Sequence, residues 1–227
     1  MEIPTLLLDK FKGTAPIFPL PDFAMFPKVG KAFKIFEPRY VEMVKDVLSG
    51  DKLMCVTQLK PGWKEDYEGN PEIHETGTLN FIFKHENIED DEFMIYTFAL
   101  KKVQILELEK THVYRKGKLT IMEDNKLISG EAEKRERLIR KFASIADISL
   151  NTEELDFFQN PLISMDMMVN TICHTLPIAP QDKQSLLELP DLSLRLDVVS
   201  QYMDSQAKAF NQESGLIDFL PIDSNWN

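Results

Sequence analysis

The chain has few of the residues that mark disulfide-rich, zinc-binding or membrane proteins. Its 227 residues include only two cysteines, Cys55 and Cys173, and neither has a second cysteine or a histidine at zinc-ligand spacing. This excludes a disulfide framework, argues against structural zinc, and is typical of a reducing cytosol. No apolar run approaches the roughly 18 residues that span a bilayer, and the N-terminal Leu6–Leu8 is too short for a signal-peptide core. We therefore expect a cytoplasmic protein without a membrane partner.

Sequence signatures of common enzymes are also missing. There is no G-x-x-x-x-G-K-[ST] phosphate loop, no G-x-G-x-x-G, no H-E-x-x-H and no G-x-S-x-G. The histidines are scattered, and the carboxylates lie mainly in solvated runs such as 89–92. We predict no catalytic residue, no metal and no cofactor. An enzyme with an unrecognised pocket stays the lowest-ranked alternative, because catalytic groups assemble from distant positions.

Positive charge is scarce. The chain holds 26 Lys and Arg against 37 Asp and Glu, a net charge of −11. Such a chain repels a phosphate backbone unless it gathers a basic face, so the composition argues against nucleic-acid binding. RNA binding remains the runner-up function. It would need a continuous basic stripe made by Lys28, Lys31, Lys34, Lys101 and Lys102.

What is present is ample core material in two parts. Hydrophobic residues make up 43% of the chain and aromatic residues 10%. Up to residue 126, β-forming residues alternate with Pro and Gly over short distances, and beyond it the apolar spacing is helical. We expect an α+β fold with a β-rich barrel or sandwich over 1–126 and an α-helical bundle over 127–227, joined at a hinge over 126–130.

The β-rich part contains several short apolar stretches. We predict a helix from Pro38 that ends at Gly50, and a strand in which Leu79, Phe81 and Phe83 share one face. Further strands are expected at 52–59, at 94–108 as one bulged strand, and at 113–122 with a hairpin turn at Lys116–Lys118.

A long loop over 60–77 interrupts the strands and contains Trp63 and Tyr67. Loops of this length are often functional or mobile. The alternative is that the two rings simply cap the barrel.

The helical part shows start and stop residues. Asn160-Pro161 and Asp191 have the chemistry of helix starts, and Gly215 that of a helix end. The predicted helices cover 131–146, 152–159, 162–176, 181–189 and 192–214. The apolar tail over 216–222 is expected to fold back onto the body.

Two stretches have specific sequences. The first stretch consists of Pro16–Pro27 and Ile35–Tyr40, which reads I-F-E-P-R-Y. The prolines in Pro16–Pro27 enforce an extended backbone around aromatic residues. We interpret this stretch as a corner that defines the fold, with a partner-docking patch as the functional alternative. The second stretch, Leu176–Glu188 with Leu194–Leu196, is typical of a helical hairpin whose turn fixes packing, and we see no chemistry in it.

These stretches resemble the N-terminal, substrate-binding domain of Lon proteases in the form of a small stand-alone protein. That family has a phrase P-L-F-P-L-P…L-F-P that leads to I-F-E-P-R-Y. It also has a G-T, matched here by Gly77-Thr78, and a later phrase L-P…K-Q-x-L-L-E…R-L. The matching stretches of this chain extend from residue 16 to about 205. The chain departs from the family pattern at Lys28, where glycine is usual, at Lys34, where histidine is frequent, and around Ala99.

The resemblance implies a PUA-like pseudo-barrel of about six strands plus one short helix, followed by a helical bundle. It also implies a non-catalytic module that binds unfolded or exposed polypeptide segments or a protein partner. The ATPase and protease modules of full-length Lon would be lacking. Candidate partner-binding residues are Phe23, Met25, Phe26, Trp63 and Tyr67, with burial in the core as the alternative for each. Family-motif residues expected to be structural are Phe36, Glu37, Pro38, Arg39, Tyr40, Lys183, Gln184 and Arg195.

Overall fold

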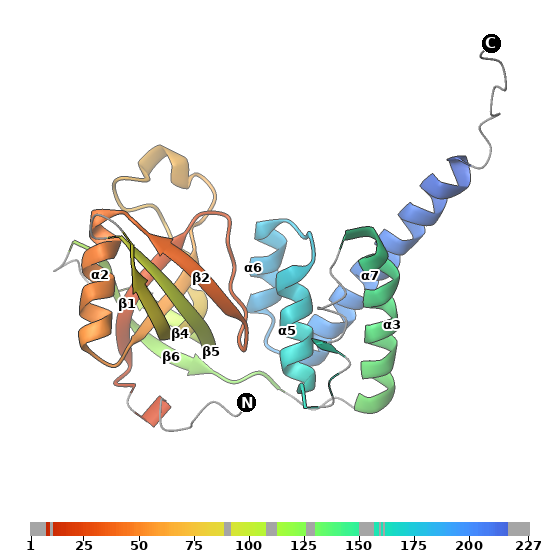
Figure 1. The fold of residues 1–227 in the computed structure, drawn as a ribbon, viewed down its shortest axis with the longest axis horizontal. Coiled ribbons are helices and arrows are strands. Elements are labelled where there is room, and N and C mark those ends of the chain that lie inside the picture. The colour runs from red at the N-terminus through yellow and green to blue at the C-terminus, as the bar shows by residue number, and fades with distance from the viewer. Residues whose placement is uncertain are drawn as a thin grey trace, which may run out of the picture.

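A computed structural model shows a β-barrel followed by a group of helices (Figure 1). It describes residues 8–9, 11–88, 92–107, 113–125, 130–149, 157–158, 160 and 162–217. The elements are β1 (Thr14–Leu20), β2 (Gly30–Ile35), α2 (Pro38–Ser49), β3 (Leu53–Gln58), η1 (Trp63–Asp66), β4 (Thr76–Asn87), β5 (Phe93–Glu107), β6 (Arg115–Met122), α3 (Glu131–Ser149), α5 (Met165–Thr175), α6 (Pro180–Glu188) and α7 (Leu192–Ile217). The predicted α+β fold class is confirmed. Most of the predicted hinge, of the 152–159 helix and of the apolar tail lies outside the described residues.

The barrel is a mixed sheet of six strands in the order β2-β5-β4-β3-β1-β6. β1 and β3 are parallel, and the other pairs are antiparallel. β5 also pairs with β6 along Lys102–Glu107, which closes the barrel on itself. β2 lies outside this closure, because its only described neighbour is the first half of β5.

The proline-rich β1 fits into the sheet because it changes neighbours along its length. Residues 14–17 pair with β6, and residues 17–20 pair with β3. Each half therefore has one open side, where a missing N–H costs no ladder bond. Pro16 and Pro19 occupy one half each, so the extended backbone predicted from the prolines is compatible with a barrel strand.

β4 and β5 are long strands that bend at two bulges. One extra residue, Leu100, lies in β5 opposite Leu79 and Asn80, and this confirms the single bulged strand predicted over 94–108. The second extra residue is Phe83 in β4. The predicted alternation is therefore wrong at Phe83, because the bulge leaves its side chain 58% exposed and apart from Leu79 and Phe81.

The hairpin turn predicted at Lys116–Lys118 is also wrong, since β6 runs straight through it. Gly117 is needed for space and not for a turn. A Cβ atom there would lie 2.7 Å from Ile17 Cδ1 and 3.2 Å from Ile105 Cγ2. Glycine inside a strand often marks such a close approach.

The helix predicted from Pro38 is confirmed as α2, with Gly50 at its C-cap. Its buried face holds Tyr40, Met43, Val44 and Val47, which pack on barrel residues such as Phe18 and Ile35. The N-cap residue Glu37 makes no side-chain cap hydrogen bond, so its carboxylate is left for other partners.

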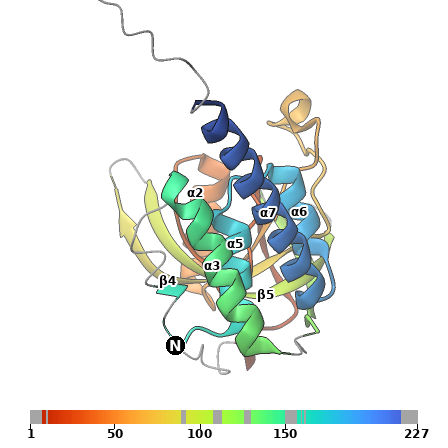
Figure 2. The ribbon, with the colours of Figure 1, turned by 90° about the vertical axis from the view of Figure 1, so that its right-hand side faces the viewer.

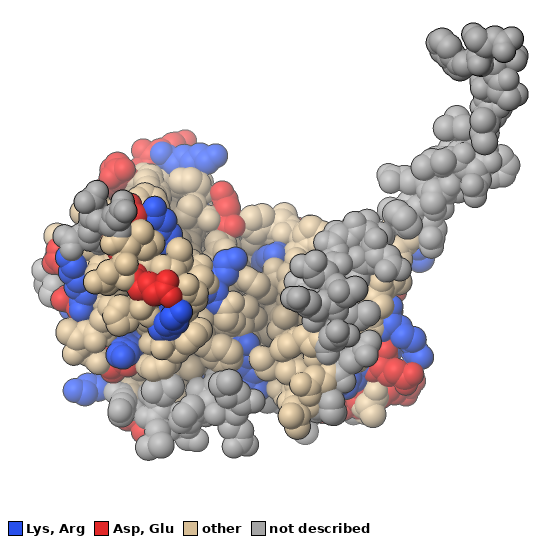
Figure 3. Space-filling model, viewed as in Figure 1, with Lys and Arg blue, Asp and Glu red and all other residues tan. Residues whose placement is uncertain are grey.

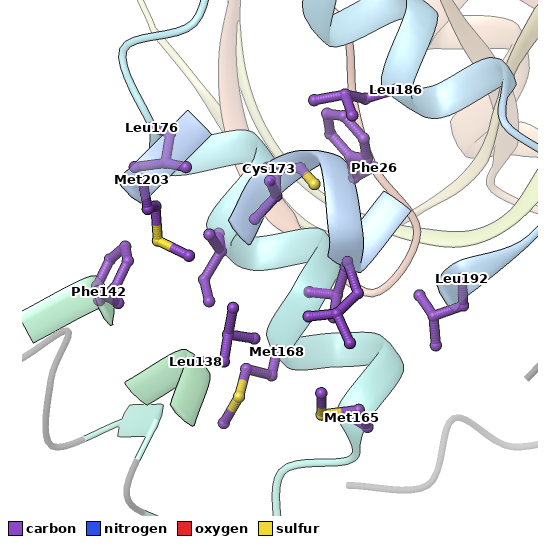
Figure 4. Packing of buried hydrophobic residues seen from close by; sticks show 14 of the residues in the cluster. Phe26, Leu138, Phe142, Met165, Met168, Cys173, Leu176, Leu186, Leu192 and Met203 are labelled. Carbon is purple, nitrogen blue, oxygen red and sulfur yellow. The ribbon is translucent and has the colours of Figure 1, made fainter. Parts of the chain in front are cut away.

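The helices form a second core, shown from their own side in Figure 2 and close by in Figure 4. α5 begins at Met165 and not at residue 162, because Asn160 Oδ1 accepts from Leu162 N and forms a turn instead of a helix cap. Asp191 caps α7 as predicted, accepting from Ser193 N at 2.6 Å. The predicted end at Gly215 is wrong, since α7 continues to Ile217.

The two halves are joined by apolar and charged contacts. Phe26, from the loop after β1, is fully buried in the helical core beside Leu186 (Figure 4). Lys28 Nζ lies 2.8 Å from both carboxylate oxygens of Asp166 in α5. Lys28 has φ +66°, a conformation that favours glycine, which gives a physical reason for the glycine usual here in the resembling family.

Among the described residues no helix is both long and apolar enough to cross a bilayer.

Candidate functional site

The connection between β2 and α2 forms an open pocket on the barrel surface. Strand β2 ends at Ile35, which is buried, and the next residue, Phe36, is 59% exposed. Pro38 then starts α2, so only two residues turn the chain from strand to helix. The pocket has a volume of about 520 Å³ and is lined by Phe36, Glu37, Pro38, Arg39, Tyr67 and Glu68.

One ion pair organises this pocket. Arg39 donates from Nε (3.0 Å) and Nη2 (2.8 Å) to Glu37 Oε2. It also donates from Nη1 to the Tyr67 carbonyl at 3.3 Å. The other Glu37 oxygen accepts from the Tyr67 hydroxyl at 2.6 Å. These contacts of Arg39 and Glu37 attach the long loop to the start of α2.

The rings of two tyrosines flank the Arg39 guanidinium. Its Cζ lies 4.8 Å from the centre of the Tyr40 ring and 5.1 Å from that of Tyr67. Burial raises the pKa of Tyr40 to about 12. Burial and the hydrogen bond to Glu37 also raise the pKa of Tyr67. Both phenols therefore stay protonated near neutral pH, and the Tyr67 hydroxyl is a donor to Glu37.

The long loop over 60–77 is folded on itself and on the barrel. A bridge between Leu59 and Ile73 closes its base, and Asp66 accepts from Gly69 N through its carbonyl and from Asn70 N through its carboxylate. Trp63 and Tyr67 pack edge to face at 5.5 Å, each half-buried against the barrel core. The two rings therefore cap the barrel, as one interpretation of the sequence had it, while their outer edges stay accessible.

The other three candidate partner-binding residues lie elsewhere. Met25 is 2% exposed in the core under α2, and Phe26 is fully buried among the helices, so neither can contact a partner in this fold. Phe23 is half-buried, edge to face with Phe33 at 5.6 Å and with His174 at 5.7 Å. Met25 and Phe26 therefore have the core position that the sequence left as the alternative, and Phe23 packs between β2 and α5.

The motif residues of the helical half lie at packing contacts. The Lys183 ammonium donates to the carbonyl of His174, in the last turn of α5, where a cation is favourable. Gln184 is 1% exposed and donates to the Thr76 carbonyl at 3.0 Å, which attaches α6 to β4. Arg195 is fully buried and donates to Asp124 Oδ2 at 3.0 Å.

The five lysines of the possible basic stripe do not form one. Four have carboxylate partners within 3 Å, and one of these, Lys102, is buried. The pairs are Lys28–Asp166, Lys34–Glu92, Lys101–Glu123 and Lys102–Asp124. The described residues also contain no group of three or more His, Cys, Asp or Glu side chains placed to hold a metal ion.

The arrangement offers recognition chemistry. The exposed ring of Phe36, the half-buried ring of Tyr67 and the Arg39 guanidinium line an open pocket beside two glutamates, and its rings suit apolar and aromatic side chains of another chain. The sequence had placed Phe36 among the structural motif residues. Its exposure could not be predicted, because buried and exposed aromatic residues both lie between prolines in this stretch.

Comparison with known proteins agrees with this architecture. Residues 14–205 match the family described as the ATP-dependent protease La (LON) substrate-binding domain. Lon protease of Desulfosudis oleivorans is 23% identical over 206 residues, and Lon protease of Parabacteroides distasonis is 26% identical over 196. These matches cover 87% and 83% of this chain but only 24% and 23% of the relatives, so the chain spans about a quarter of their length.

Two solved structures have the same fold. The N-terminal domain of the Mycobacterium avium complex Lon protease superposes with a TM-score of 0.65 at 12% identity, and a Lon N-terminal domain protein from Xanthomonas campestris with 0.61 at 18%. Each match covers 84% of this chain and 98% of the other. The family match, the relatives and the fold agree, and the chain belongs to the Lon substrate-binding domain family.

Proposed function

We propose that the protein is a non-catalytic recognition module that binds exposed segments of unfolded polypeptides at the pocket formed by Phe36, Arg39 and Tyr67. The single observation that carries this proposal is the 59% exposure of Phe36 beside a pocket that the family motif itself builds. Membership of a substrate-binding family supports recognition of polypeptides as the general role.

The chemistry of the pocket supports a polypeptide as ligand. A large exposed ring is costly to hydrate and gains free energy when another apolar group covers it. Arg39 is held by Glu37 and Tyr67, so its guanidinium is already oriented. Unfolded proteins expose apolar and aromatic side chains that folded proteins bury. The pocket thus favours unfolded over native chains without a need for one sequence.

The test is a binding titration. Fluorescein-labelled α-lactalbumin, reduced and with its cysteines capped by neutral groups, is titrated with the protein and followed by fluorescence anisotropy. We expect saturable binding, about tenfold weaker for Phe36→Ala, since truncating a central aromatic contact typically costs more than about 1 kcal/mol. The native, disulfide-bonded form should bind far less.

Phe83→Ala is the matched control, because Phe83 is a phenylalanine of similar exposure, 58%, on β4. It should bind like the wild type. No saturable binding of the unfolded probe would overturn the proposed function. Equal losses for the two variants, or a loss for Phe83→Ala alone, would overturn the assignment of the pocket.

A further inference from the structure

β2 has one edge without a neighbour among the described strands. All six of its residues pair with β5, from Gly30 opposite Phe98 to Ile35 opposite Phe93. No strand pairs with its other side, whereas every other strand of the sheet has neighbours on both sides over part of its length. The barrel closes through β5 and β6 without β2. A strand edge of this kind is a template for another chain.

The backbone groups at this free edge can be assigned from the ladder. The N–H of Ala99 donates to the carbonyl of Val29, just before β2. Because peptide groups alternate in direction along an antiparallel strand, Lys31, Phe33 and Ile35 direct theirs at β5. Gly30, Ala32 and Lys34 therefore direct their N–H and C=O groups outward. All three are exposed.

Side chains leave room for another strand. Gly30 and Ala32, on the solvent face, are too small to block an approaching backbone. On the opposite face Phe33 is half-buried, packing edge to face on Phe18 and Phe23 at 5.6 Å each. Phe36 and the pocket follow directly after the last residue of β2. The pocket therefore begins one residue beyond the end of this edge.

The charge beside this edge is positive, although the chain as a whole carries −11. No described residue offers Lys31 or Lys183 a carboxylate partner. Lys183 lies near β2, because its ammonium donates to the His174 carbonyl and Phe23 packs on both the His174 ring and Phe33 of β2. Burial lowers the pKa of Lys183, and the charge of Lys31 lowers it further. Blue side chains with little red lie in the hollow between barrel and helices (Figure 3).

We propose that β2 takes up an extended, acidic segment of the bound polypeptide as an additional strand, with main-chain hydrogen bonds to Gly30, Ala32 and Lys34. This rests on the proposed function and adds to it the conformation and charge of the preferred client. Main-chain pairing supplies affinity that does not depend on sequence. The charge of Lys31 and Lys183 selects acidic over basic segments, and Phe36 receives an apolar side chain where the added strand leaves β2.

A second copy of the chain is a poorer occupant of this edge. Two copies would each bring a net charge of −11 and would juxtapose their lysine-bearing edges. Lysines at an edge strand oppose pairing between copies.

The first test is amide hydrogen exchange of the protein, measured by NMR with and without peptide. The probes are fluorescein-labelled peptides of about eight residues, long enough to cover β2, that alternate valine and threonine with either glutamate or lysine and end in phenylalanine. The glutamate peptide should slow exchange at Gly30, Ala32 and Lys34 while Lys31 and Phe33 stay as in the free protein. This alternating pattern arises from strand addition and not from side-chain binding.

Substitutions provide the second test. Ala32→Pro removes one outward N–H and leaves the β5 ladder intact, because proline is tolerated where an edge N–H faces solvent. It should weaken binding of the glutamate peptide about tenfold, while the matched Ala32→Ser, which keeps the N–H, should not. Lys31→Glu should weaken binding about threefold, against no change for Lys118→Glu on the exposed side of β6.

The outcomes separate this proposal from the proposed function. Tight binding without the alternating protection, or equal affinity of Ala32→Pro and Ala32→Ser, would overturn strand addition and leave the pocket standing. Equal binding of glutamate and lysine peptides would overturn the charge preference. Protection at Gly30, Ala32 and Lys34 that grows with protein concentration alone would identify a second copy as the occupant and overturn the proposal. If neither the peptides nor the unfolded α-lactalbumin probe binds, both the proposed function and strand addition are overturned.

Discussion

Two arginines of the family motifs, Arg195 and Arg39, form ion pairs in opposite environments. Arg195 is fully buried and Asp124 is 10% exposed, whereas Arg39 and Glu37 are 22% and 24% exposed. Both arginines also donate to backbone carbonyls. The chemistry is the same at both places, so any difference in role must come from burial and from what surrounds each pair.

The Arg195 pair joins the two halves of the molecule. Its guanidinium also reaches the carbonyls of Leu186 and Leu189, which the end of α6 leaves without helical partners. Asp124 is shared with Lys102 of β5, and Lys102 also donates to the Leu189 carbonyl. Every polar group in this cluster depends on another, so removing one leaves several buried groups unsatisfied.

The Arg39 pair lies at the surface and is bordered by rings. Solvent can replace any partner that a substitution removes, so the pair contributes little to stability. Its orientation is nevertheless fixed by Glu37 and Tyr67. We infer that Arg195 serves folding because it is sealed from water, and we propose recognition as the role of the partly exposed Arg39. Two predictions test this difference, and one tests the buried boundary between barrel and helices; they follow in order of decreasing effect.

The largest effect is expected for Arg195→Met. It leaves Asp124 and the α6 carbonyls without their donor, and breaking a buried ion pair from one side typically costs about 3–5 kcal/mol. The free energy of unfolding, from urea denaturation, measures the loss. Arg140→Met is the control, because the Arg140–Glu136 pair is 67% and 70% exposed and should change stability by less than about 0.5 kcal/mol.

If Arg195→Met does not fold, Asp124→Asn offers a milder disruption of the same cluster, with the same measurement. Stability losses below about 1 kcal/mol for these variants would contradict the structural role of the cluster.

An intermediate effect is expected from His174, which lies between the barrel and the helices. Burial, with the nearby charges of Lys183 and Lys31, lowers its pKa from 6.5 to about 4. Between these pH values the unfolded chain binds more protons than the folded one, so this histidine makes stability fall as pH drops from 6.5 to 4. The size is about 3 kcal/mol over the window.

His174→Gln removes the titration and keeps a polar side chain of similar size. Urea denaturation of both proteins at several pH values measures the difference in unfolding free energy. That difference should shrink steadily as the pH falls through the window. Parallel pH profiles for the two proteins would show that His174 is not responsible.

Much of the fold could be predicted from the sequence because local rules dominate it. Pro38 and Gly50 bound α2, Asp191 caps α7, and the shift from strand to helix spacing separates the two halves. The failures involve contacts between distant residues. Gly117 resembles a turn residue until Ile17 and Ile105 crowd it, and the bulge that exposes Phe83 depends on how β4 meets β5.

The candidate site was only partly predictable for the same reason. The sequence singled out Tyr67 and Arg39 separately, but only the fold brings the loop to the start of α2. Met25, Phe26 and Phe36 are all large apolar residues, and only the fold shows that the first two are buried and the third is exposed. Nothing in the sequence of β2 reveals that only β5 pairs with it among the described strands, because strand pairing is decided by the order of strands in the barrel.

The smallest effect is expected at the Arg39 pair, which paired double-mutant cycles compare directly with the Arg195 pair. For Arg39→Met with Glu37→Gln we expect a coupling energy of at most about 1 kcal/mol in urea denaturation, as for exposed pairs. For Arg195→Met with Asp124→Asn the coupling should exceed about 2 kcal/mol, because the pair is sealed from solvent. In the anisotropy assay Arg39→Met should weaken binding of unfolded α-lactalbumin about fivefold, close to 1 kcal/mol. Equal coupling energies, or an Arg39 variant that binds like the wild type, would show that exposure does not separate the roles of the two arginines.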